Sequence, residues 1–189
     1  MGRMTKPLRA DAARNRDKLL TAATAVFGER GLDAPLEHIA RRAEVSIGTL
    51  YAHFPTREAF FDAIFPQRLA ALDRIAEAAL AEPDAWSGFV HFLEGLYALQ
   101  AQDRGLNDAL AQRYPEAKGV AEACGRGIVN AERIMERAKR SGRLRADYGL
   151  ADLAALTSAI SQIIRDSSGD EPGAWQRFLA LYLGGLRTQ

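Results

Sequence analysis

Two short helical patterns joined by a tight polar turn, within residues 36–57, constrain the fold of this chain more than any other segment. The first pattern places its apolar residues at the spacings i, i+3, i+4 and i+7 of one helical face: Leu36, Ile39, Ala40 and Ala43. Glu44 and Val45 then interrupt the pattern, and Ser46 can cap a second helix by accepting a backbone N–H. This arrangement predicts a helix-turn-helix over about residues 35–54.

The second helix of the pair has one apolar face and one small, polar face. Leu50 and Phe54, four residues apart, lie on the inward face. The opposite face and its flanks carry small or polar residues: Gly48, Thr49, Ala52, Tyr51 and His53. A helix that is anchored from behind and small in front suits entry into the DNA major groove.

The residues of this segment match a family pattern in register. The pattern F-x-x-x-G occurs at 27–31, I-A-x-x-A at 39–43 and V-S-x-G-T-L-Y-x-H-F at 45–54, and Pro-Thr-Arg-Glu follows at 55–58. Over roughly residues 14–65 the chain therefore resembles the DNA-binding domain of TetR-family transcriptional repressors. The resemblance implies an all-α fold of about nine helices, with a three-helix DNA-binding head followed by a helical-bundle domain that binds a ligand and forms a homodimer.

The geometry and the resemblance together predict the DNA contacts: Arg42, Ser46, Ile47, Gly48, Thr49, Tyr51, His53 and Arg57. The resemblance implies that the Tyr51 hydroxyl binds a phosphate, and Arg57 could hold a phosphate together with the N-terminus of its helix. Many family members carry Thr or Ser at the entry to the first helix of the pair, whereas this chain has Ala34-Pro35-Leu36. Glu37 could accept a hydrogen bond from cytosine or belong to a solvated face, and the solvated face is favoured.

Charge is distributed unevenly along the 189 residues. Residues 1–57 hold ten Lys and Arg against six Asp and Glu, whereas the rest of the chain is slightly acidic. A basic front end is expected where only one end of a protein meets phosphates. The single cysteine excludes an intramolecular disulfide, and no run of eighteen apolar residues or signal peptide is present. These features predict a cytoplasmic protein.

The sequence predicts three parts: a flexible basic arm at 1–11, a head at 12–56 and a ligand-binding and dimerisation domain at 57–189. The first helix is expected over about 12–30. Pro66 lies inside the helix that begins near Thr56, where a proline removes one hydrogen bond at a cost of about 3 kcal/mol. We expect a kink or break there, and a hinge that transmits the effector signal is one hypothesis for its role.

The body of the chain contains candidate residues for an effector cavity: Trp86, Phe89, His91, Phe92, Tyr97, Tyr114, Cys124 and Met135. Aromatic residues at helical spacing belong to the core more often than to a ligand site. His91 has no second ligand at metal-binding spacing, and no metal or cofactor is predicted. Cys124 could be a buried, inert thiol or a redox sensor.

Apolar stripes in the last two predicted helices favour a homodimer interface. The resemblance to the TetR family also implies dimerisation through these helices. The predicted interface residues are Leu153, Leu156, Ile160, Ile163, Trp175, Phe178, Leu179 and Tyr182. The same stripes could instead pack within their own domain.

The sequence thus predicts a sequence-specific transcriptional regulator, most simply a repressor that a small-molecule effector releases from a palindromic double-stranded DNA operator. A DNA-binding regulator without a ligand and a helical protein-interaction adaptor are the alternatives. An enzyme is not predicted, because the three histidines are scattered and the chain has no nucleophile motif, metal-ligand cluster or phosphate-binding glycine loop.

Overall fold

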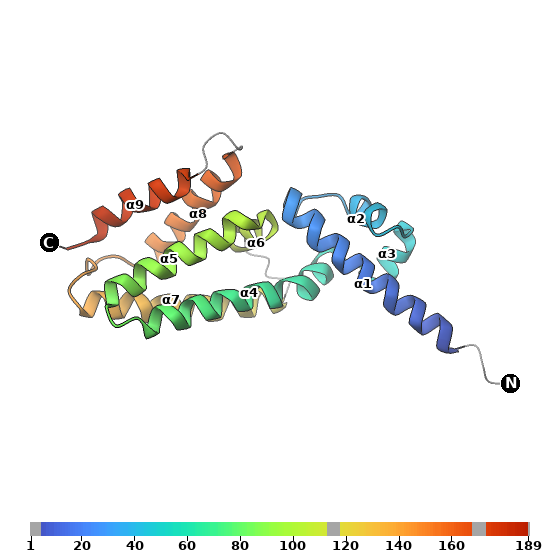
Figure 1. Ribbon diagram of the computed structural model, residues 1–189, viewed down its shortest axis with the longest axis horizontal. Coiled ribbons are helices and arrows are strands. Elements are labelled where there is room, and N and C mark those ends of the chain that lie inside the picture. The colour runs from blue at the N-terminus through green and yellow to red at the C-terminus, as the bar shows by residue number, and fades with distance from the viewer. Residues whose placement is uncertain (1–4, 113–117, 168–172, 189) are drawn as a thin grey trace.

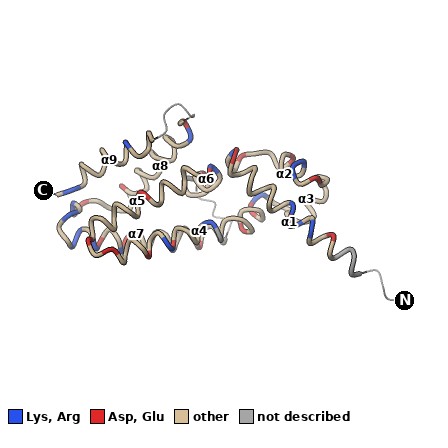
Figure 2. Tube along the Cα trace, in the orientation of Figure 1, with Lys and Arg blue, Asp and Glu red and all other residues tan. Residues whose placement is uncertain are grey.

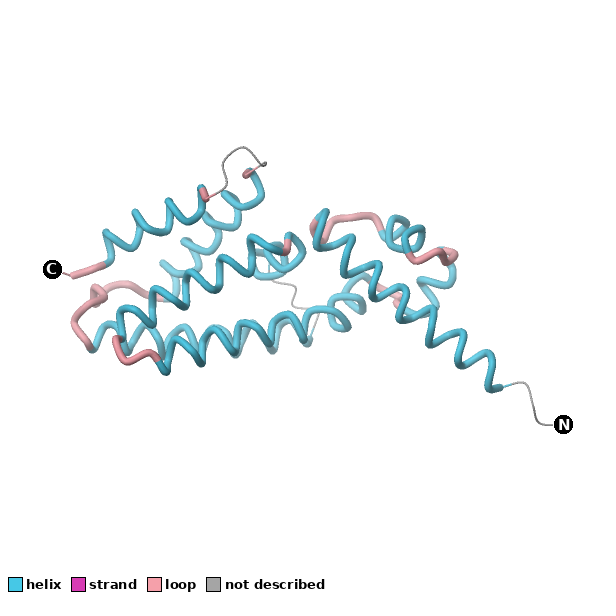
Figure 3. Tube along the Cα trace, viewed as in Figure 1, coloured by secondary structure: helices cyan, strands magenta, loops and turns pink. Residues whose placement is uncertain are grey.

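The computed structural model describes residues 5–112, 118–167 and 173–188, which form nine α-helices (Figure 1). The helices are α1 (Thr5–Arg30), α2 (Leu36–Arg42), α3 (Ile47–His53), α4 (Arg57–Ala81), α5 (Ala85–Gln102), α6 (Arg104–Gln112), α7 (Lys118–Arg140), α8 (Leu150–Asp166) and α9 (Ala174–Leu186). Figure 3 shows loops but no strand between these helices, so the predicted all-α class is confirmed for the described residues. None of the helices in these ranges is long and apolar enough to span a membrane.

The helices form an elongated molecule with α1, α2 and α3 at one end (Figure 1). The N-terminus lies at that end and the C-terminus lies at the other. α4 runs from the first group into the second, where it packs along α7 and α5. α8 and α9 pack against each other and against α5.

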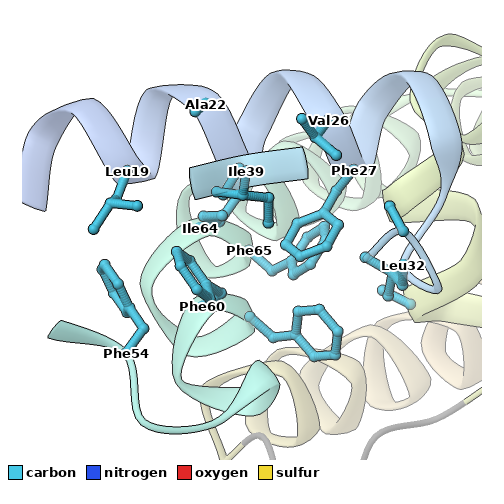
Figure 4. Packing of buried hydrophobic residues seen from close by; sticks show 14 of the residues in the cluster. Leu19, Ala22, Val26, Phe27, Leu32, Ile39, Phe54, Phe60, Ile64 and Phe65 are labelled. Carbon is cyan, nitrogen blue, oxygen red and sulfur yellow. The ribbon is translucent and has the colours of Figure 1, made fainter. Parts of the chain in front are cut away.

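The core of the head is made by α1, α2, α3 and the first half of α4, and buried residues of α6 and α7 belong to the same cluster (Figure 4). Phe27 of α1 makes edge contacts with Phe60 and Phe61 of α4, and Phe54 stacks on Phe60 with ring centroids 4.0 Å apart. All four rings are almost fully buried. Because these phenylalanines belong to one cluster, the core of the head continues past residue 56, and the first half of α4 is part of it.

The N-terminal helix begins earlier than the sequence pattern predicts. α1 starts at Thr5, so residues 5–11 of the predicted arm are helical, while residues 1–4 lie outside the described part. Pro7 is in the first turn of α1, where a missing N–H breaks no helical hydrogen bond. Most of the neighbouring residues, including Leu8, Arg9 and Ala10, have good helix propensity even without an apolar stripe.

α4 is continuous from Arg57 to Ala81, and the break expected at Pro66 does not occur. Phe65 and Leu69, on either side of the proline, are buried in the core of the head. The start of α7 also packs here, because the Gly119 N–H donates to Asp62 Oδ1 at 2.9 Å and a Cβ on Gly119 would lie 3.2 Å from Pro66 Cγ. Packing on this segment therefore outweighs the cost of the missing hydrogen bond.

A second, non-covalent connection joins the head to the body through α6. The Leu32 N–H donates to Asp108 Oδ2 at 3.0 Å in a buried position. Gly31, with a φ of 80°, faces the same carboxylate so closely that a Cβ would lie 2.4 Å from Oδ2. Arg68 of α4 pairs with Asp103 and donates to the carbonyl of Thr24 in α1 at 3.2 Å. The head is thus held by α6 as well as by α4.

Candidate nucleic-acid interface and cavity

The turn between α2 and α3 is closed by a specific pattern of backbone hydrogen bonds. The Glu44 N–H donates to the carbonyl of Arg41 at 3.2 Å, and the Val45 N–H donates to that of Ala40 at 3.0 Å. Glu44 has a φ of 56°, in the left-handed region. These features define a Schellman motif with Glu44 at the position that usually carries glycine. The motif ends α2 sharply and directs the chain into α3.

Ser46 caps α3 as predicted. Its Oγ accepts a hydrogen bond from the Thr49 N–H at 3.1 Å and lies 2.9 Å from Thr49 Oγ1. The two hydroxyls therefore hold each other in place at the start of the helix. Thr49 presents its side chain from a fixed position rather than as a free rotor.

The outer face of α3 is open to solvent while its inner face is fixed in the core. Leu50 is fully buried and Phe54 nearly so, whereas Ile47 is 39% exposed and Tyr51 is 47% exposed. Gly48 also lies on the open side, where the nearest neighbour of an added Cβ would be 3.8 Å away. An exposed isoleucine and tyrosine on one short helix, with no side chain between them at Gly48, form a surface that can lie close to another molecule.

The two arginines of the predicted DNA contacts are engaged within the head. Arg57 Nη1 donates to the carbonyls of Leu32 and Ala34, at 2.9 Å for the second, in the loop before α2. Arg57 therefore holds this loop through Nη1, and a phosphate contact through its other guanidinium nitrogens stays a prediction. Arg42 donates to both carboxylate oxygens of Glu29, at 2.9 and 2.8 Å, on the surface. This hydrogen-bonded pair lowers the pKa of the Glu29 carboxyl.

Arg16 is a basic residue near α3 that the sequence pattern did not indicate as a DNA contact. It is exposed on α1, and its guanidinium lies 5.1 Å from the centre of the Phe54 ring, at the end of α3. Figure 2 shows Lys and Arg along α1 and α2 on this end of the molecule. The position of Arg16 depends on how α1 crosses α3, and no local pattern in the sequence carries that information.

A cavity of about 310 Å³ lies in the body among α4, α5, α6, α7 and α8. Two of the predicted cavity residues, Phe92 and Cys124, line it. Among the described residues, those that line the cavity are Leu72, Ala76, Phe92, Leu96, Gln100, Leu110, Cys124, Gly127, Ile128, Ala131, Leu150, Leu153, Ala154, Thr157 and Ser158. The volume is at the lower end of the range of about 300–1,000 Å³ that small-molecule sites occupy.

The other cavity candidates lie elsewhere. Phe89 and Met135 are buried core residues, and Trp86 packs on Phe89 with ring centroids 5.8 Å apart. Tyr97 is fully buried behind the cavity, with its hydroxyl 3.2 Å from Thr157 Oγ1, and burial raises its pKa. His91 is exposed 3.5 Å from Glu82, and Tyr114 lies outside the described residues.

Half of the predicted dimer residues pack within their own protomer. Leu153, Leu156, Ile160 and Leu179 are buried in the core of the body, which supports the alternative that these residues pack within their own domain. The stripes of α8 and α9 face each other and α5, which accounts for this burial. Ile163, Trp175 and Tyr182 are half-buried, and Phe178 is 37% exposed. Leu181, which was not predicted, is 71% exposed beside Phe178 on α9.

Comparisons with known proteins agree with this geometry. Residues 19–64 match the family model described as bacterial regulatory proteins of the tetR family, and residues 83–188 match the C-terminal domain of SbtR-like transcriptional regulators. This chain belongs to the TetR family. It is a TetR-family transcriptional regulator whose helix-turn-helix is formed by α2 and α3.

Solved structures extend the similarity over almost the whole chain. The TetR transcriptional regulator SCO0520 from Streptomyces coelicolor is 32% identical, covers 92% of this chain and 99% of its own, and has a TM-score of 0.57. The TetR regulatory protein from Mycobacterium vanbaalenii is also 32% identical, with 96% and 100% covered and a TM-score of 0.52. The ketosteroid regulator KstR2 of Mycobacterium tuberculosis shares the fold at 22% identity, with 92% and 95% covered and a TM-score of 0.65.

Proposed function

We propose that this TetR-family regulator is a homodimeric repressor that binds a palindromic DNA operator and leaves it when a small molecule enters the cavity. The observation that carries the DNA-binding part is the outer face of α3, where Ile47 and Tyr51 are exposed on a helix whose other side is buried. A short helix fixed in this way can enter a major groove without moving its core.

In this proposal each head reads one half of the operator. The contacts come from Ser46, Ile47, Gly48, Thr49, Tyr51 and His53 at the groove, with Arg42 and Arg16 at the phosphates. The head comprises the helices up to the first half of α4, and the remaining helices form the effector and dimer domain. The dimer would use the exposed side of α9. Such a regulator works where the chromosome is, in the cytoplasm.

Two relatives support an effector in the body. The solved structure of RolR is a complex with resorcinol, and that of FadR from Bacillus subtilis is a complex with stearoyl-CoA. These proteins share the fold of this chain at 20% and 18% identity. The cavity lies among the helices that follow the head, where a ligand can change how α4 and α6 hold the head.

A pair of alanine variants tests the DNA-binding surface. Ala52 and Ala121 are both exposed helical alanines, the first on α3 and the second on α7. Ala52→Glu places a carboxylate at the proposed groove face and should abolish binding to a duplex from the upstream region of the gene, measured by fluorescence anisotropy. Ala121→Glu should bind like the parent protein. Equal binding by Ala52→Glu and the parent would contradict the proposal.

A further inference from the structure

Gln100 is a buried amide at the wall of the cavity. Its side chain is fully buried, and neither Nε2 nor Oε1 has a hydrogen-bond partner among the described residues. Gln100 belongs to α5 and lines the cavity. Buried polar groups in folded proteins are almost always paired, so an orphaned donor and acceptor beside an internal space require an explanation.

Apart from Ser158, the other described lining residues offer few polar groups that could bind a ligand. None of the fifteen lining residues is charged, and most are apolar or small. The Thr157 hydroxyl already donates to the carbonyl of Leu153 at 2.8 Å and lies 3.2 Å from the Tyr97 hydroxyl. An ion brought into this cavity would find no countercharge among the described residues of its wall, which disfavours carboxylates and amines strongly.

We propose that the cavity binds a small, uncharged, mainly apolar molecule whose one polar end pairs with the Gln100 amide. That end must donate to Oε1 and accept from Nε2 at the same time. A carboxamide does this best, because its N–H and C=O lie side by side in one plane, as do those of the glutamine. The proposal rests on the assignment of the cavity as the effector site, and it names the chemical class of the effector.

We place an entrance to the cavity beside Gly127 of α7. Gly127 lines the cavity, and a Cβ built on it would meet nothing within 4 Å. Its neighbour Ile128 also lines the cavity and is 42% exposed, so the wall reaches the surface here. A leucine at 127 can therefore fill the entrance without a clash in the backbone. Gly125, which is equally open but not part of the lining, offers a matched control.

Thermal unfolding of the full-length protein with three matched probes tests the ligand class. The probes are 4-phenylbutanamide, the charged 4-phenylbutanoate and butylbenzene, which lacks the polar end. The amide should raise the melting temperature of the parent most, and the carboxylate should have no effect. Gln100→Met, which keeps the size but removes the amide, should weaken 4-phenylbutanamide roughly tenfold or more and leave butylbenzene unchanged.

Several results would overturn the proposal. Equal stabilisation of the parent by the amide and by butylbenzene would mean that Gln100 pairs with water rather than with a ligand. Equal amide binding by Gln100→Met, stabilisation by the carboxylate, or no shift with any probe would also overturn it. If Gln100→Met fails to fold, the glycine variants decide: Gly127→Leu should lose amide binding and Gly125→Leu should keep it. Amide binding by Gly127→Leu, or its loss in Gly125→Leu, would contradict the proposal.

Binding to DNA is measured separately, so the two proposals fail in different ways. Amide binding without a change in operator affinity would support the ligand class and contradict the effector role of the cavity. If the protein binds the operator but no probe raises its melting temperature, the DNA-binding proposal stands and the proposed ligand class is contradicted.

Discussion

At the scale of single residues, the head depends on side chains that satisfy its loops. Arg57 donates to the carbonyls of Leu32 and Ala34, which lie between α1 and α2. These carbonyls would otherwise lack a partner in a partly buried loop, and an unmade hydrogen bond of this kind costs about 1–3 kcal/mol. Arg57 therefore places the loop, and with it α2, relative to the first turn of α4.

Arg57→Ala should lower the free energy of unfolding by about 1–3 kcal/mol, because it removes the donor to both carbonyls. Arg42→Ala is the matched control, since it breaks only an exposed pair with Glu29 and should cost no more than about 1 kcal/mol. Urea unfolding of the two variants measures the difference. Similar losses in both would show that Arg57 has no structural role beyond a surface arginine.

The left-handed Glu44 gives a second prediction at this scale. Glu44 has a φ of 56°, a left-handed conformation that costs an L-residue roughly 1–2 kcal/mol. Glycine avoids this cost but loses more backbone entropy on folding, which offsets part of the gain. Glu44→Gly should therefore stabilise the protein by about 0.5–1 kcal/mol. Glu77→Gly, the same change at an exposed site inside α4, should destabilise it by about 1 kcal/mol. A melting temperature of Glu44→Gly below that of the parent protein would contradict the left-handed conformation of Glu44.

At the scale of helices, local periodicity predicted most elements but not how long they run. The helix-turn-helix was predicted because the spacing of Leu36, Ile39 and Leu50 is a local signal. The continuity of α4 through Pro66 was not predicted, because it depends on tertiary packing in the core of the head and against α7. The early start of α1 was missed because a polar helix carries no apolar stripe.

Pro66→Ala tests what the proline does in α4. The substitution restores one helical hydrogen bond and should raise the free energy of unfolding by up to about 3 kcal/mol, with operator affinity unchanged. A hinge at Pro66 additionally predicts that the carboxamide probe releases the variant from DNA less readily than the parent. Identical release curves for the variant and the parent would contradict the hinge. The contact of α6 with the head, through Asp108 and Leu32, would then be the alternative route for the effector signal.

The same limit explains which site residues the sequence could predict. The outer face of α3 follows from helical spacing, and Ile47 and Tyr51, two of the predicted DNA contacts, are exposed. The position of the cavity cannot be predicted from helical spacing. Large aromatic residues such as Phe89 fill space, whereas an internal space remains where small residues such as Ala76, Gly127 and Ala131 meet. Candidates chosen for size therefore fell mostly in the core.

At the scale of the molecule, α9 presents an exposed apolar edge that a second copy can cover. Leu181 is 71% exposed and Phe178 is 37% exposed on the side of α9 away from the core. Leu181→Arg should convert the dimer to a monomer in light scattering at micromolar concentration, because it would bury an unpaired charge. Val129→Arg, at a residue 55% exposed on α7, should remain dimeric. A parent protein that is monomeric under these conditions would contradict the dimer.

Specific DNA recognition by α3 is the central claim, and selection from a pool of random duplexes tests it most directly. The parent protein should enrich a palindrome whose two halves are read by two heads. Thr49→Ala should enrich a sequence with a changed preference at one position of each half, equivalent to about 1–3 kcal/mol. Enrichment of no sequence by the parent, or of the same sequence by Ala52→Glu, would contradict the account.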